Sequence, residues 1–148
     1  MDAKLLILAI FLSIVCFGQK SIYPKDTIYV KYEHNGKNKK SQNTYKYNNK
    51  ELSGIFFYIK DGTTNYKKGI SLFHSYNSKA DTLCHKHLTD YHFSNLKEID
   101  KKRHKWIFDN KRPPADRNGV FQTYLIEIIL NNKFVVYPVI WAGEGIID

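Results

Sequence analysis

The chain has 148 residues, 23 basic against 14 acidic side chains, a formal net charge of +9 and two cysteines. This length fits one ordinary domain and excludes a second one of usual size. Two cysteines exclude a small fold that several disulfides stabilise, so a hydrophobic core has to supply the stability.

Residues 1–18 have the pattern of a secretory signal peptide. One basic residue precedes an apolar run at 5–17, and Gly18 closes the run as a small residue. We expect cleavage after Gly18 or Gln19, which leaves a single mature domain at 19–148 that is secreted or periplasmic. The run is shorter than the roughly 20 residues that a spanning helix needs, so no transmembrane helix is expected in the mature protein.

Cys16 raises the alternative of a lipid anchor. Bacterial lipoproteins carry small residues before the modified cysteine, whereas the bulky Val15 precedes Cys16. We therefore expect soluble export and not lipidation. Export would leave Cys84 as the only cysteine of the mature chain and would exclude an internal disulfide. The net charge would stay the same, because 1–18 carries one acidic and one basic side chain.

The first half of the mature sequence predicts β-strands separated by polar turns. Runs of apolar, β-branched and aromatic residues indicate strands at 27–33, 44–47, 53–60 and 69–76. The polar segment 37–43 predicts a loop. Apolar residues on both faces of 53–60 indicate a central strand.

The pattern changes after Phe93 and predicts the main helix near residues 94–108. Ser94 is the expected N-cap, and Pro113-Pro114 is the expected stop. The apolar residues at helical spacing are Leu96, Ile99, Trp106 and Ile107.

A turn at 116–119 leads to the most apolar strand, predicted at 120–130 and expected at the centre of the sheet. A hairpin joins it to a strand at 134–141, in which Pro138 lacks a backbone donor and predicts an edge position or a bulge. Together these segments predict an α+β domain, with a mostly antiparallel sheet of about five to seven strands and one main helix.

The predicted helix carries lysines on the side opposite its apolar residues. This basic ridge consists of Lys97, Lys101, Lys102 and Lys105. It suits an acidic protein or another component of the cell envelope, although exposed lysines also keep proteins soluble without any partner. Nucleic acid would satisfy the same charges, but export makes it an unexpected partner.

The densest group of potential metal ligands is Cys84, His85, His87 and His92. An extended backbone puts His85 and His87 on one face, and a helix aligns Cys84 with His87. A closed zinc site needs about four ligands at defined spacing, and no second cysteine pair completes one here. We expect no cofactor. The alternative is a transition metal such as zinc, or a small secreted hydrolase centred on 84–92, including a ribonuclease-like one.

Glu127 lies inside the apolar run 124–130. A carboxylate with a raised pKa in this run could act as a base, but acid and base chemistry usually needs a second titratable group. We expect Glu127 to face solvent or to pair with a lysine across the strand. No motif is specific to a reaction, so the sequence favours a non-catalytic binding protein for an acidic partner.

Overall fold

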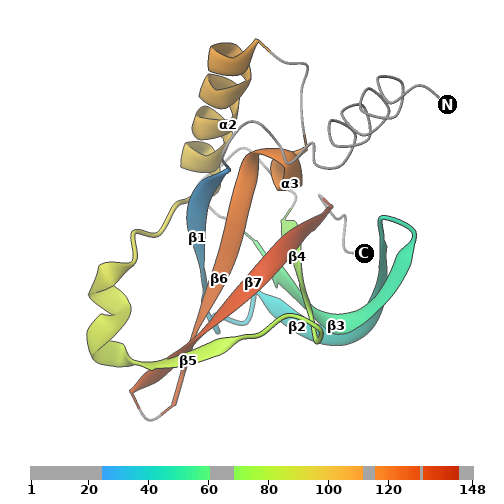
Figure 1. The fold of residues 1–148 in the computed structure, drawn as a ribbon. Coiled ribbons are helices and arrows are strands. Elements are labelled where there is room, and N and C mark those ends of the chain that lie inside the picture. The colour runs from blue at the N-terminus through green and yellow to red at the C-terminus, as the bar shows by residue number, and fades with distance from the viewer. Residues whose placement is uncertain (1–24, 61–68, 112–115, 131, 144–148) are drawn as a thin grey trace, which may run out of the picture.

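The computed structural model describes residues 25–60, 69–111, 116–130 and 132–143 (Figure 1). The strands in this part are β1 (Asp26–Tyr32), β2 (Lys39–Tyr47), β3 (Lys50–Ile59), β4 (Ile70–Ser75), β5 (Asp81–Cys84), β6 (Phe121–Ile129) and β7 (Lys133–Gly143). The helices in it are the 3-10 helix η1 (His85–Asp90), α2 (Leu96–Asn110) and α3 (Arg117–Val120). The predicted signal peptide at 1–18 lies outside the described residues.

The described strands form one sheet in the order β1-β6-β7-β4-β3-β2, and β5 pairs with β7 on the side of β4. β1 runs parallel to β6, and all other pairs are antiparallel. The expected α+β class and mostly antiparallel sheet are therefore confirmed. β6, the expected central strand, lies second from one edge, and β3 lies second from the other.

Side-chain alternation gives the sheet an inner and an outer face. The inner face forms the larger hydrophobic core, in which Phe57, Leu72 and Leu125 are fully buried. α2 adds Leu96 and Ile99 to this core and lies beyond one end of the sheet, beside β1 and α3 (Figure 1). The main helix thus covers the core with one side and leaves its other side to solvent.

α2 begins after Asn95, so the expected N-cap, Ser94, is wrong by one residue. Asn95 Oδ1 accepts a hydrogen bond from the Glu98 backbone N–H at 2.9 Å, and Glu98 Oε2 accepts one from the Asn95 N–H at 3.2 Å. This capping box satisfies two of the N–H groups at the helix start. Ser94 donates its backbone N–H to the Tyr29 carbonyl at 2.9 Å instead, which ties the helix start to β1.

The turn expected at 116–119 is in fact the start of α3. Asp116 is its N-cap, and Asp116 Oδ1 accepts the Gly119 backbone N–H at 2.7 Å. The expected helix stop at Pro113-Pro114 lies outside the described residues.

The loop predicted at 37–43 is wrong, because β2 starts at Lys39 and pairs with β3 along its whole length. Most residues of this edge strand are exposed, so no alternation of apolar residues marks it in the sequence. Asn48 and Asn49 both have positive φ, 48° and 61°, and close the hairpin between β2 and β3. β5 has no counterpart among the predicted strands.

The sequence predicts an edge position or a bulge from Pro138. The edge position is wrong, because β7 lies inside the sheet. The register of β7 against β4 does shift, but between Gly143 and Trp141, which pair with Ser71 and Leu72, and not at Pro138. β5 pairs with β7 as far as Val136, and β4 pairs with it from Ile140 onward. Pro138 lies between these two parts. Neither β4 nor β5 pairs with β7 at this position, so neither strand needs the N–H group that proline lacks.

Replacing Gly54 with alanine should destabilise the fold, because a Cβ atom there would lie 2.0 Å from the His74 carbonyl oxygen and 2.7 Å from the Phe73 ring. Overpacking of this kind costs about 1 to 3 kcal/mol. Urea unfolding followed by circular dichroism measures the loss, with the exposed neighbour Ser53→Ala as control. Equal stability of the two variants would contradict the close approach of β3 and β4.

Candidate functional site

The described residues contain one carboxylate in the core, Glu127 on β6, whose side chain is 3 % exposed. Three donors surround it. Lys40 Nζ lies 2.7 Å and the Tyr137 hydroxyl 2.9 Å from Oε2, and His34 Nε2 lies 3.0 Å from Oε1. We call these four residues the Glu127 cluster. Both carboxylate oxygens are therefore engaged.

The members of the Glu127 cluster come from distant parts of the sheet. Tyr137 is on β7, next to β6, and His34 follows β1. Lys40 is on β2, which three strands separate from β6 in the strand order. Lys40 and Glu127 can touch only if the sheet curls until its β2 edge reaches the inner side of β6.

The surroundings keep the Tyr137 phenol neutral. Burial, the charge of Glu127 and the hydrogen bond to it raise the pKa of Tyr137 well above its usual range, so the phenol keeps the proton that it donates. Burial and the charge of Glu127 also raise the pKa of Tyr32. Lys40 Nζ lies 5.2 Å from the ring centre of Phe57 and 5.5 Å from that of Tyr137, so aromatic faces surround the ammonium group.

The sequence predicts that Glu127 either faces solvent or pairs with a lysine across the strand, and this geometry agrees with neither in full. The side chain does not face solvent, and its lysine partner is not on a neighbouring strand. For the base role considered for Glu127, the structure shows a carboxylate with Lys40 and Tyr137 at Oε2 and His34 at Oε1. The buried histidine His74 lies beside Tyr137 with ring centres 5.0 Å apart, but its Nδ1 is 3.0 Å from the Pro138 carbonyl oxygen. The cluster acts as a structural clamp.

The segment of Cys84, His85, His87 and His92 has all four of these side chains exposed. His87 Nδ1 lies 3.5 Å from Asp90 Oδ2. Among the described residues, no group of three or more histidine, cysteine, aspartate or glutamate side chains is placed to hold a metal ion. The structure therefore does not bring the four predicted ligands together.

The apolar residues of this segment explain its position. Leu88, Tyr91 and Phe93 pack on the smaller core of the outer face, around Ile126 and Phe134. The rings of Tyr91 and Phe134 lie 5.6 Å apart at 80°. The segment covers the outer face of β6 and β7, and its histidines occupy the side that faces solvent.

The basic ridge lies where the sequence predicts it, on the solvent side of α2, and all four of its lysines are exposed. Lys105 forms an ion pair with Asp109 at 2.5 Å. Lys97, Lys101 and Lys102 form no ion pair with any residue that the structure describes. Their ammonium groups therefore carry exposed positive charge.

Sequence reasoning found the ridge and missed the partners of Glu127. The signal for Glu127 was a lone carboxylate in an apolar run, but nothing in the sequence marks Lys40 among 23 basic residues, because 87 positions separate the two.

Comparison with known proteins gives no match to a family model, a curated protein or a solved structure. Among the described residues, no helix is both long and apolar enough to cross a membrane.

Glu127→Gln should lower the free energy of unfolding by about 2 to 3 kcal/mol, because it leaves Lys40 near the core without its counter-charge. The expected loss is below that of a fully buried pair, since the Lys40 side chain is 35 % exposed and can rehydrate. Urea unfolding at pH 7 measures it. The exposed Glu51→Gln on β3 is the control and should change stability by less than about 0.5 kcal/mol. Similar losses in both variants would show that Glu127 is not a clamp.

Tyr137→Phe should make the free energy of unfolding decrease less steeply as the pH rises in the alkaline range. Unfolded tyrosines ionise near pH about 10, whereas the raised pKa keeps Tyr137 protonated in the fold, so unfolding becomes easier as the pH rises. One such group contributes up to about 1.4 kcal/mol per pH unit. Tyr32, Tyr45 and Tyr91, whose pKa values are also raised, act in the same direction in both proteins.

Urea unfolding between about pH 9 and pH 11.5 gives this slope. Tyr76→Phe, at a residue that is 52 % exposed, is the control and should keep the wild-type slope. A Tyr137→Phe variant with the wild-type slope would contradict the assignment.

Proposed function

We propose that this chain is an exported, non-catalytic binding protein that recognises an acidic protein or envelope component through the basic ridge of α2. The observation that supports this proposal is that all four ridge lysines are exposed and that three of them, Lys97, Lys101 and Lys102, form no ion pair within the described part of the chain. Long-range attraction between such a surface and an acidic partner speeds association and orients the two molecules.

An exposed aromatic residue on the same side of α2 strengthens the proposal. Phe108 is 83 % exposed, which is unusual for a large apolar side chain in a helix with a buried face. Helical spacing aligns Phe108 with Lys101 and Lys97, seven and eleven residues earlier. Aromatic residues are enriched where proteins bind one another, so the ridge offers an apolar contact together with charge.

The other side of α2 holds the ridge in place. Leu96 and Ile99 are buried in the core, and Asp100 forms an ion pair with Arg117 of α3 at 3.0 Å. A surface fixed in this way loses little conformational entropy when a partner binds.

The export part of the proposal rests on the signal-like pattern of 1–18. The alternative, a metal protein or hydrolase centred on Cys84, His85, His87 and His92, stays a prediction. Elemental analysis of untagged protein tests it, and stoichiometric zinc would favour it over the binding proposal.

Reversing the ridge charge should abolish capture of an acidic partner. We suggest the variant Lys97→Glu, Lys101→Glu, Lys102→Glu and Lys105→Glu. The matched control changes four exposed lysines outside α2 by the same charge: Lys39→Glu, Lys46→Glu, Lys50→Glu and Lys133→Glu. Quantitative mass spectrometry of proteins and glycans captured from the native cell envelope compares the two variants with the unmodified chain.

The expected result is a specific acidic component that the unmodified chain and the control retain, and that the ridge variant loses by about tenfold or more. Retention should also weaken as salt is raised, because salt screens exposed charges. If the ridge variant captures the same components as the control, the basic ridge is not the binding surface.

A further inference from the structure

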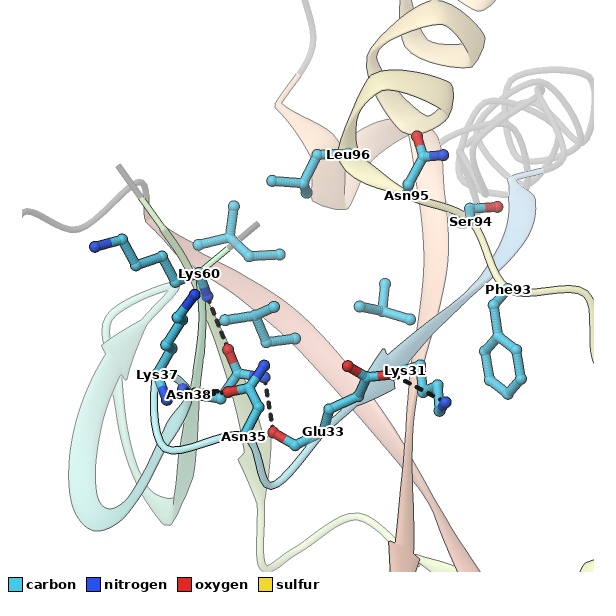
Figure 2. A pocket seen from close by; sticks show the side chains of 13 residues that line it. Lys31, Glu33, Asn35, Lys37, Asn38, Lys60, Phe93, Ser94, Asn95 and Leu96 are labelled. Carbon is cyan, nitrogen blue, oxygen red and sulfur yellow. Dashed lines mark hydrogen bonds and ion pairs between the residues drawn. The ribbon is translucent and has the colours of Figure 1, made fainter. Parts of the chain in front are cut away.

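A cavity of about 520 Å³ lies between β1, the end of β3, the start of β4 and the first turn of α2 (Figure 2). Its apolar floor consists of Val30, Ile59, Ile70 and Leu96, all members of the inner core. The cavity therefore reaches from the surface to the core. Its size lies within the range of small-molecule sites.

The position of the cavity follows from the shape of the sheet. β1 forms one edge of the sheet, and no described strand pairs with its outer edge. Phe93 makes a single bridge to Tyr29, and beyond that point Val30, Lys31 and Glu33 line the cavity. The inner face is thus left open between β1 and the end of β3.

Positive charge dominates the walls. Lys31 and Glu33 form an ion pair at 2.9 Å on the β1 side. Lys37 and Lys60 lie on the opposite wall, as Figure 2 shows, and neither forms an ion pair with a residue that the structure describes. The start of α2 lines the cavity through Asn95 and Leu96, and its capping box already satisfies the first N–H groups of the helix.

Hydrogen bonds fix the wall that carries the two lysines. Asn35 Oδ1 accepts the backbone N–H groups of Lys37 and Asn38, each at 3.0 Å. Asn38 Nδ2 donates to the Glu33 carbonyl at 2.8 Å, and Asn38 Oδ1 accepts the Lys60 backbone N–H at 3.0 Å. The chain segments that hold Lys37 and Lys60 are therefore joined before any ligand arrives, which lowers the entropy cost of binding.

We propose that this cavity binds a small amphiphilic anion, with the head group at Lys37 and Lys60 and the apolar chain against the floor. A neutral apolar ligand would leave both lysines uncompensated, and a bare anion would leave the floor unused. The proposal goes beyond the binding of an acidic partner, because no residue of the basic ridge lines the cavity.

Octanoate, acetate and 1-octanol test the two halves of the proposal separately. Titration of the isotope-labelled protein, followed by the methyl resonances of Val30, Ile59 and Ile70, locates and quantifies binding. We expect octanoate to bind saturably with a Kd below about 1 mM, and acetate and 1-octanol to bind at least about tenfold more weakly. Weaker or absent octanoate binding would overturn the proposal, as would equal binding of either of the other two probes.

The variant Lys37→Gln/Lys60→Gln should weaken octanoate binding by about tenfold or more. Both side chains are exposed, so the substitutions are expected to preserve the fold. Lys46→Gln/Lys50→Gln removes the same charge outside the cavity and should leave the affinity unchanged. Equal affinity of the two variants would overturn the role of Lys37 and Lys60. Capture of an acidic partner through the basic ridge is measured independently of either result.

Discussion

The fold depends on one buried carboxylate, Glu127, on the inner side of a curled sheet. A charge at this depth is stable only when donors replace the water that it has lost. Lys40, His34 and Tyr137 supply these donors from β2, the β1–β2 connection and β7. Because β2 is the far edge of the sheet, satisfying Glu127 requires the sheet to curl, and the curl encloses the larger core.

The curl also divides the surfaces of the molecule. Where β2 reaches β6 the inner face is closed, and the opening that remains between β1 and β3 is the cavity beside α2. On the outer face, Leu88, Tyr91 and Phe93 cover the second core and leave the neighbouring histidines in solvent. The Glu127 cluster joins distant strands, whereas the basic ridge presents its charge to solvent.

Local sequence patterns predicted the parts of this fold that bury alternating or helical apolar faces. The strands near 27–33 and 53–60 and the helix near 94–108 carry such faces, and all three exist within a few residues of the expected bounds. β2 lacks one, because an exposed edge strand is held by backbone pairing with β3 and needs no apolar side chains. The edge position predicted from Pro138 failed for a related reason. The effect of a proline on strand pairing depends on which strand lies opposite it, and the local sequence does not show that.

The candidate sites also differ in whether the local sequence predicts them. The basic ridge follows from helical spacing alone, so the sequence contained it. The Glu127 cluster and the cavity arise from the curl of the sheet, which depends on contacts between residues far apart in the chain. No local pattern encodes which of many lysines meets Glu127 or where the inner face stays open.

A double-mutant cycle between Glu127 and Lys40 tests this account most directly. The free energies of unfolding of Glu127→Gln, Lys40→Met and the double variant, measured in urea at pH 7, give the coupling between the two side chains. The account predicts that the double variant is more stable than the sum of the single losses implies, by about 1 kcal/mol or more. Additive losses, within about 0.5 kcal/mol, would mean that β2 is not clamped to β6 by this pair, and would contradict the curled sheet on which the description of both faces depends.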